Sequence, residues 1–340
     1  MFNLSGVHPV GIIGIAIAGA LILPLIGGFF GLLYRGFDRK LAAQMQGRVG
    51  PPVVQPFRDV GKLFMKESII PEGAVSWLFT AAPFLALLAS AAILLYLPVF
   101  GQQALLSNYG DAILVLYLLI IPSLAMVLGG FASSSPYATV GAQREMVIMM
   151  SYEFPLAVAI ISLAWRIGQV TTANPFMLST MAQYPIWNIV GPVGAIGVVL
   201  LLGTLMFVTP GEAAKVPFDI AEAETEIAGG ILIEYSGRNL AMFYMADMLK
   251  AFIMAAIVVA LFIPYNLSPL FGLGQPVLAG IVDALFFLVK TFVVMFISIT
   301  LLRVAVARFK ISQASSIYFV TTTAIGLFGL LLLWIDMIIM

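Results

Sequence analysis

The sequence contains no cysteine and only one histidine, His8, among its 340 residues. Without cysteine the chain cannot supply thiolates to an iron–sulfur cluster or a structural zinc site, and it cannot form a disulfide. One imidazole is too few for a bis-histidine haem or a three-ligand metal centre, and we interpret His8, near the terminus, as incidental. We therefore expect no cofactor and no metal in this chain, and we expect any redox chemistry to reside on another chain.

Charge is also scarce, and what charge there is cancels. Only 9% of the residues are charged and 62% are hydrophobic, whereas an ordinary soluble domain is about 25% charged and about 45–50% apolar. The net charge is zero, so there is neither a basic field for nucleic acid nor an acidic tail for a partner. These values exclude a soluble globule and predict a protein whose solvent is the membrane.

Eight apolar windows are long enough to cross a bilayer, which takes about 20 residues per helix. We predict an all-α polytopic fold, with residues 1–340 forming a single integral membrane domain and no soluble domain before or after it. The first window is too long for a signal-peptide core and has no small-residue cleavage site, so we interpret it as a retained span. The eight predicted spans are 7–33, 74–98, 112–131, 145–165, 188–208, 240–263, 277–302 and 316–339.

Lysine and arginine are concentrated in alternate loops. Thirteen of the 16 lie in every second connection between spans or at its borders, and the loops around 100–111, 168–187 and 264–276 contain none. Because cytoplasmic loops retain positive charge, both termini are predicted to lie on the outer side of the cell membrane. The two long charged loops, 35–71 and 209–239, make the cytoplasmic face the working surface. No internal repeat is visible, which disfavours a transporter built from inverted repeats.

Five charged residues fall well inside predicted spans, away from the span ends, at a combined insertion cost of roughly 12–18 kcal/mol. Asp247 and Lys250 are three residues apart, and Asp283 and Lys290 are seven apart, so the members of each pair share a helical face and could neutralise each other. Glu153 has no basic residue within one turn. Two interpretations remain open, namely structural ion pairs that fix helix packing or a buried chain of titratable groups that moves protons.

The loop 209–239 carries the densest group of acids. Pro217 suits the first turn of a helix and Gly229 with Gly230 can end one, so we predict a helix over 217–228. Within that helix Asp219, Glu222 and Glu226 would form one stripe of mutually repelling carboxylates, suited to proton exchange near neutral pH. An ordinary solvated acidic helix explains the spacing equally well. The acids of this loop are Glu212, Asp219, Glu222, Glu224, Glu226 and Glu234.

The loop 35–71 contains a second amphipathic segment. Over 56–67 apolar residues alternate with charged ones such as Arg58 and Lys62, which predicts a helix lying along the membrane interface. It could be a lipid-headgroup anchor or a docking platform for a peripheral subunit, and periodicity does not separate the two.

Three segments carry a family resemblance. They are QGRVGPPVVQPFRDVGKLFMKE at 46–67, GGFASSSPYATVGAQREMVIMMSYEFPL at 129–156 and AAKVPFDIAEAETEIAGGILIEYSG at 213–237. Together they resemble the membrane subunit that anchors the redox arm in respiratory complex I and its relatives, and the resemblance covers nearly the whole chain. In quinone-reducing complex I the first of these segments reads RxGPNRVGPxGLLQPxADxxKL. The shorter form here is similar to that of energy-converting nickel–iron hydrogenases of the Ech type.

The resemblance implies roles for the charged residues and for partner chains. It implies an iron–sulfur small subunit, a large catalytic subunit bearing the nickel–iron centre, and antiporter-like membrane subunits. The positions implied to contact the peripheral subunits are Arg48, Arg58, Lys62, Arg144 and Arg308. The positions implied to couple electron transfer to proton or sodium movement are Glu153, Glu212, Asp219, Glu222, Glu224, Glu226, Glu234, Asp247, Lys250, Asp283 and Lys290.

Three functions follow from these observations. The first is the membrane anchor and ion-translocating coupling subunit of an energy-converting hydrogenase, without a catalytic centre of its own. The second, within the same family, is the quinone-site subunit of an NADH or other donor:quinone oxidoreductase. The third is an ion transporter that acts alone, which would work in liposomes without any partner.

Overall fold

The computed structural model describes residues 9–107, 109–272 and 276–339, so His8 lies outside the described residues. Within these ranges the chain is helical and has no strand. Eight helices of this part of the chain are long and apolar enough to cross a membrane, which confirms the predicted number of spans. The helices that carry the argument are α1 (Pro9–Met45), α2 (Gln55–Met65), α3 (Ser76–Ile93), α4 (Ala112–Ala132), α5 (Pro136–Gly168), α6 (Leu178–Gln183), α7 (Pro192–Glu212), α8 (Glu224–Ile227), α9 (Gly237–Phe262), α10 (Pro276–Met295), α11 (Leu302–Ala305), α12 (Ile311–Ser316) and α13 (Thr323–Ile339).

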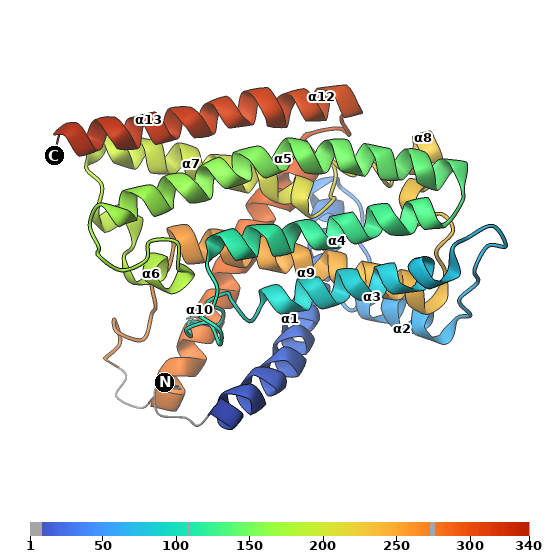
Figure 1. The fold of residues 1–340 in the computed structure, drawn as a ribbon, viewed down its shortest axis with the longest axis horizontal. Helices are drawn as coiled ribbons and strands as arrows, with labels where there is room; N and C mark the ends of the chain where they lie inside the picture. Colours follow the sequence, from blue (N-terminus) through green and yellow to red (C-terminus); the bar gives the residue numbers. More distant parts are fainter. Residues whose placement is uncertain (1–8, 108, 273–275, 340) are drawn as a thin grey trace.

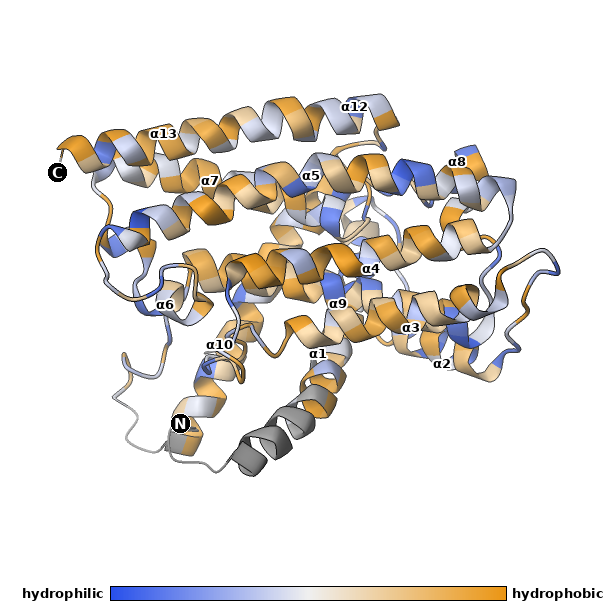
Figure 2. Ribbon diagram, viewed as in Figure 1, coloured by the Kyte–Doolittle hydropathy of each residue, from blue (hydrophilic) through white to orange (hydrophobic). Residues whose placement is uncertain are grey.

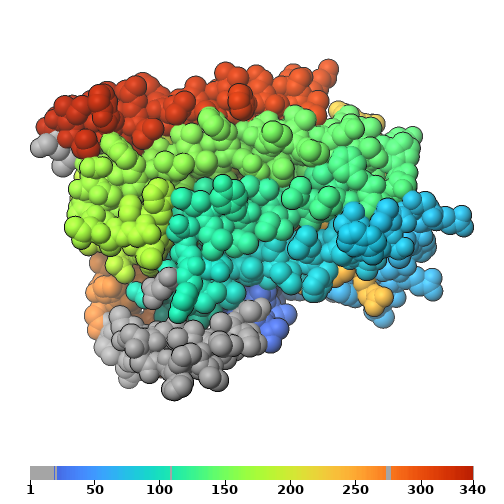
Figure 3. All heavy atoms as spheres, viewed as in Figure 1, coloured from blue at the N-terminus to red at the C-terminus, as the bar shows by residue number. Residues whose placement is uncertain are grey.

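Most of the spans run side by side, while α1 and α10 cross the view at a steep angle to them (Figure 1). The segment from α12 to α13 extends along the edge of the bundle beside α5 and α7 (Figures 1 and 3). Apolar residues dominate the middle of the helices and polar residues gather near the end that carries α2 and α8 (Figure 2). This end also holds the basic connections, as the sequence predicts for the cytoplasmic side.

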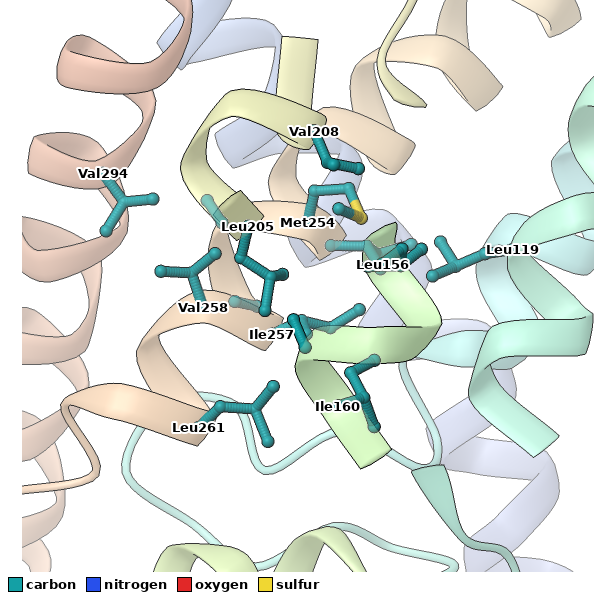
Figure 4. Close-up of a cluster of buried hydrophobic side chains, with 14 of the residues drawn as sticks. Leu119, Leu156, Ile160, Leu205, Val208, Met254, Ile257, Val258, Leu261 and Val294 are labelled. Carbon is teal, nitrogen blue, oxygen red and sulfur yellow. The ribbon is translucent and has the colours of Figure 1, made fainter. Parts of the chain in front are cut away.

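Helix α9 lies at the centre of the bundle. Of its most apolar window 89% is buried, against 33–56% for the other seven spans, and it packs against α1, α3, α7 and α10. Figure 4 shows its side chains Met254, Ile257 and Val258 meeting Leu205 of α7 and Leu156 of α5. After Lys250, α9 is apolar on every side. Such a segment suits an interior position, because every face then meets protein instead of water.

Helix α5 begins at Pro136, nine residues before the predicted start of its span at 145. Pro136 stands at the first turn, where its missing N–H and fixed φ fit a helix start. The early start places Arg144 and Glu145 on a rigid helix, and Glu145 is buried.

The amphipathic helix predicted for 56–67 is present as α2. Its apolar face packs against α1 and α9, where Val60 contacts a small cluster with Leu32 and Met248. Arg58 and Lys62 lie on the exposed face.

The helix predicted for 217–228 is wrong. Only α8, Glu224–Ile227, is helical there, and the residues before it follow an irregular path. Phe218 is buried and its ring lies 4.4 Å from that of Tyr318, while the backbone carbonyl of Ala221 accepts a hydrogen bond from the N–H of Ile231. These tertiary contacts hold the backbone in a non-helical conformation, although the local sequence permits a helix. Asp219, Glu222 and Glu226 therefore do not form a stripe on one helical face.

At the opposite end of the bundle a buried carboxylate fastens α13 to α7. Asp336 accepts hydrogen bonds from the backbone N–H groups of Gly191 and Gly194, both at 2.9 Å. Its carboxylate also lies 3.6 Å from the guanidinium of Arg166 on α5. An anion at a helix N-terminus is stabilised by the free N–H groups and the helix dipole, so this contact fixes one end of α7.

Candidate functional site

A cavity of about 390 Å³ lies at the end of the bundle that carries the basic loops. Its walls come from α1, α9, the end of α10 and the irregular segment before α8. One wall is apolar and includes Phe292, Met295, Phe296 and Ile299. The rest is dense in charge, with Arg35, Asp38, Arg39, Lys215, Asp219, Glu222, Glu224, Arg303 and Arg308.

Arg303 and Arg308, which lie between α10 and α12, form part of the rim of the cavity. Each of them binds a carboxylate that is distant in the sequence. Arg308 binds both oxygens of Asp219, from Nε at 2.8 Å and from Nη2 at 2.7 Å. Arg303 donates to Asp38 at 2.8 Å, and the hydroxyl of Thr300 donates to the other oxygen of the same carboxylate. The fork at Asp219 holds the irregular segment before α8, and the two separate bonds at Asp38 hold α1, against the end of α10 and its continuation.

Asp247 of α9 lies behind the wall of the cavity, where it contacts the lining residues Lys215 and Arg35, and it also lines the small cavity that holds Glu212 and Lys250. Its carboxylate accepts a hydrogen bond from Lys215 and lies 3.4 Å from the guanidinium of Arg35. Burial lowers the pKa of Lys215, and the carboxylate of Asp247 opposes that shift. Burial likewise raises the pKa of Glu222 to about 7, and the neighbouring charge of Asp247 adds to it. A carboxyl group with that pKa exchanges its proton near neutral pH.

The local pairing of Asp247 with Lys250 is wrong. Lys250 instead reaches α7, where its ammonium lies 2.7 Å from the carboxylate of Glu212, and it donates to Ser123 of α4 at 2.6 Å. The side chains of Lys250 and Glu212 are only 5% and 2% exposed. Because neighbouring helices offer each residue an oppositely charged partner, the bonds run between helices and tie α4, α7 and α9 together.

Glu145 and Tyr152 of α5 extend this group. Glu145 shares a cavity of about 10 Å³ with Ser123, Glu212 and Lys250, and the hydroxyls of Tyr152 and Ser123 are 3.3 Å apart. A space of that size is no larger than one water molecule needs, so these polar groups pack closely on one another. We call Glu145, Glu212 and Lys250, with Ser123 and Tyr152, the inner cluster.

Glu153 is half-buried one residue after Tyr152. Among the described residues none donates a hydrogen bond to its buried Oε1. The charges of Glu212 and Lys250 act on this carboxylate, which therefore stands at the edge of the inner cluster.

Within the described residues Asp283 and Lys290 make no direct ion pair, although the charge of Asp283 acts on Lys290. Asp283 accepts hydrogen bonds from the N–H groups of Leu267 and Ser268 and from the hydroxyl of Ser268. Lys290 donates to the carbonyls of Ile263 and Tyr265 at 2.9 and 2.8 Å. Both side chains thus hold the connection after α9 onto α10, at the end of the bundle opposite the large cavity.

The residues expected to contact peripheral subunits divide into two groups. Arg58, Lys62 and Arg48 are exposed. Arg144 instead binds Glu226 at 2.5 Å, and Arg308 binds Asp219 as described above, so both are engaged within the chain.

The other acids of the segment 209–239 differ in exposure. Glu224 is exposed and lines the large cavity, and Glu234 is half-buried. No group of three His, Cys, Asp or Glu side chains in the described ranges could hold a metal ion.

Sequence reasoning missed several polar members of this arrangement. Glu145 stands at the edge of a predicted span, where a charge is unremarkable, and only the helix-compatible residues before it indicate a longer helix. Ser123 and Tyr152 look like ordinary span residues, and nothing in their spacing relates them to Lys250. Only tertiary contacts bring the other missed charges to the cavity, namely Arg35, Asp38, Arg39, Lys215 and Arg303.

The fold and these groups define a polytopic membrane subunit that leads charged side chains from one surface into the bilayer interior. The family model for NADH dehydrogenase matches residues 17–334. The chain therefore belongs to the NADH dehydrogenase family, as the sequence resemblance to complex I and its hydrogenase relatives indicates.

Individual relatives extend the comparison. A subunit of the NADH-quinone oxidoreductase of Brevibacillus brevis is 31% identical over 328 residues, covering 93% of this chain and 91% of the relative. Hydrogenase-4 component C of Escherichia coli is 33% identical over 251 residues, covering 74% and 75%. A chain of the membrane-bound sulfane sulfur reductase, an archaeal respiratory membrane complex, superposes with a TM-score of 0.80 at 28% identity over 94% of this chain and 99% of that one. The protein is thus a membrane subunit of the superfamily that contains complex I and membrane-bound hydrogenases.

Proposed function

We propose that this chain is the membrane anchor and coupling subunit of a multi-subunit redox-driven ion pump of the energy-converting nickel–iron hydrogenase type. The observation that carries the proposal is the succession of charged groups from the large cavity to Glu153 on α5. It passes from Arg308 and Asp219 at the rim to Lys215 and Asp247, and from there to the inner cluster and Glu153. Ionisable groups inside a membrane domain mark ion pathways by default.

The mechanism that this arrangement supports is electrostatic. Electron arrival on a partner chain near the cavity changes the local charge, and Glu222, with its pKa of about 7, responds by taking up or releasing a proton. That change alters the field at Asp247 and its partner Lys215. Asp247 stands one helical turn before Lys250 on α9, so the altered field reaches the inner cluster, where the Lys250–Glu212 contact can weaken or strengthen.

The partner subunits belong to the same proposal. The relatives are named as a subunit and a component of larger assemblies, which supports a complex. We assign the peripheral iron–sulfur small subunit and the large catalytic subunit to the face with α2, where Arg58 and Lys62 are exposed. Antiporter-like membrane subunits would meet the side that holds Glu153, and both termini would lie on the outer side of the membrane. The iron–sulfur clusters and the nickel–iron centre would reside on the peripheral partners.

A quinone site is the second candidate because one wall of the cavity is apolar. A volume of about 390 Å³ falls within the range of small-molecule sites, and Phe292, Phe296 and Ile299 could contact a ring. The opposite walls carry nine charged side chains. Since ligand pockets are lined mainly by apolar groups, this composition favours ion handling over quinone binding.

The test uses the gently solubilised native complex that contains this chain. Nickel is measured against the large partner, and ion uptake per electron is measured after reconstitution into vesicles. Near-stoichiometric nickel supports the hydrogenase. Absent nickel with quinone-dependent turnover would favour the second candidate, and ion transport by the isolated chain in liposomes would contradict the need for partners.

The coupling role has its own variants. Glu153→Gln should lower ion uptake per electron while the complex still assembles and transfers electrons. Glu212→Gln should act in the same direction in the complex that assembles, although it leaves the ammonium of Lys250 buried without its partner. Glu67→Gln, at an exposed position after α2, is the matched control and should leave the ratio unchanged. Loss of the whole complex from the membrane in the Glu153 variant, with the control intact, would indicate a structural role only.

A further inference from the structure

A second hollow, of about 480 Å³, lies beside the large cavity at the end of α1. Three arginines, Arg39, Arg48 and Arg303, line it, and none of the described residues in its wall is a carboxylate. The rest of its lining is small, apolar or neutral: Ala42, Ala43, Gln46, Val49, Gly50, Pro51 and Val216. A hollow with this lining presents several guanidinium groups to whatever enters it.

Each arginine of the hollow has a hydrogen-bond partner within the chain, but the three positive charges are only partly neutralised. Arg39 donates to Asp59 at 3.0 Å and Arg303 to Asp38 at 2.8 Å, while Arg48 donates to the neutral amide of Gln46. Three cations thus face two carboxylates, which leaves one positive charge. Each guanidinium has five donors, so donors remain for a further anion. The side chains of Arg39 and Arg303 are 32% and 38% exposed, which leaves those donors accessible.

The hollow lies at the level where two membrane spans end. The spans Leu21–Met45 and Val277–Ala305 finish within about two turns of Arg39 and Arg303, which places both at the depth of lipid headgroups.

An apolar seam lies further along the same two helices and borders the large cavity, whose wall includes Phe292. Phe37 of α1 contacts Phe292 of α10, with ring centroids 5.6 Å apart. Phe37, Val293 and Ile297 are 36%, 45% and 44% exposed, so the seam is open to acyl chains.

We propose that the hollow binds the phosphate of an anionic phospholipid, whose acyl chains lie along the seam between α1 and α10. Basic pockets between membrane helices on the cytoplasmic side bind such headgroups, and the planar fork of arginine matches two phosphate oxygens. A free phosphate ion would use the arginines but not the seam. The proposal stands independently of ion coupling and of the electron acceptor.

The experiment measures lipid retention by the purified complex. The complex is stripped of lipid by detergent exchange and supplied with phosphatidylglycerol or phosphatidylcholine, and bound lipid is counted by native mass spectrometry. Wild type should retain one phosphatidylglycerol in preference to phosphatidylcholine. Arg48→Gln, which breaks no ion pair, should weaken retention roughly tenfold, as expected for one charge-assisted hydrogen bond. Arg303→Gln should weaken it as well, and Lys66→Gln, exposed outside the hollow, should not.

Three results would overturn the proposal. Unchanged retention in both arginine variants would place the lipid elsewhere. Displacement of the lipid by millimolar inorganic phosphate would indicate a small-anion site. Because the chain has no cysteine, a cross-linker on Val49→Cys can report what fills the hollow, and efficient capture of a partner subunit in the presence of phosphatidylglycerol would show that protein occupies it instead.

Discussion

Replacing Lys250 by methionine is the most direct test of the inner cluster. The change keeps the length and bulk of the side chain but removes the ammonium that lies 2.7 Å from Glu212, at a site where both side chains are almost fully buried. Removing one member of a buried pair leaves the other charge uncompensated, which typically lowers the free energy of unfolding by about 3–5 kcal/mol. We expect a loss of that size for Lys250→Met.

The assay is a double-mutant cycle on the detergent-solubilised chain, with the free energy of unfolding measured for each variant. Glu212→Gln alone removes the other charge and leaves the ammonium buried. The double variant leaves no buried charge from this pair, so it should be more stable than the sum of the single losses predicts, by up to about 3 kcal/mol. Lys66→Met, on the exposed surface, should stay within about 0.5 kcal/mol of wild type.

Additive losses in the cycle would refute the reasoning, because they would mean that the two side chains do not interact. A loss below about 1 kcal/mol for Lys250→Met would refute it too, since that is the size of an exposed pair rather than a buried one.

Four further predictions concern other parts of the molecule. Because the pKa of Glu222 is raised from 4.5 to about 7, the folded chain binds the proton more tightly than the unfolded one. The contribution of this group to stability therefore falls as pH rises between these values. Glu222→Gln should remove that part of the pH dependence of the melting temperature, and an unchanged profile would contradict this prediction. Arg308→Lys should speed hydrogen exchange over 217–228, because an ammonium cannot bind both oxygens of Asp219 in the same planar fork; wild-type exchange would show that the fork is dispensable. Asp283→Asn should lower the melting temperature but not ion uptake per electron, and a selective loss of uptake would restore the coupling role expected from sequence. Arg58→Glu should release the peripheral subunits from solubilised membranes, and an intact, active complex would argue against docking there.

The bilayer makes the membrane-spanning part of this fold predictable from sequence. In a bilayer every backbone polar group must be bonded within the chain, so an apolar window of sufficient length has to be a helix. Hydropathy alone therefore predicts all eight spans, and the period of α2 predicts a helix with Arg58 and Lys62 on its outer face. The start of α5 is predicted too late because Arg144 and Glu145 look like the edge of a span, whereas partners from neighbouring segments allow the helix to carry them.

The acidic segment shows where local reasoning fails. Pro217 and the two glycines permit a helix, but a helix of that length is stabilised mainly by what it packs against. The burial of Phe218 and the fork between Arg308 and Asp219 require a different backbone path. Both contacts depend on the C-terminal part of the chain, which no window around residue 217 includes.

The class of protein follows from composition and spacing, because the absence of cysteine, the low charge and the eight apolar windows are visible without any coordinates. Most of the charged positions that matter are visible there too. Which charges meet is a property of the tertiary packing, since Lys250 pairs with Glu212 of α7 and Asp247 with Lys215 after α7, and not with each other along α9. Spacing within one helix specifies a face, whereas a buried charge is stabilised by whichever opposite charge the packing of neighbouring helices brings within reach.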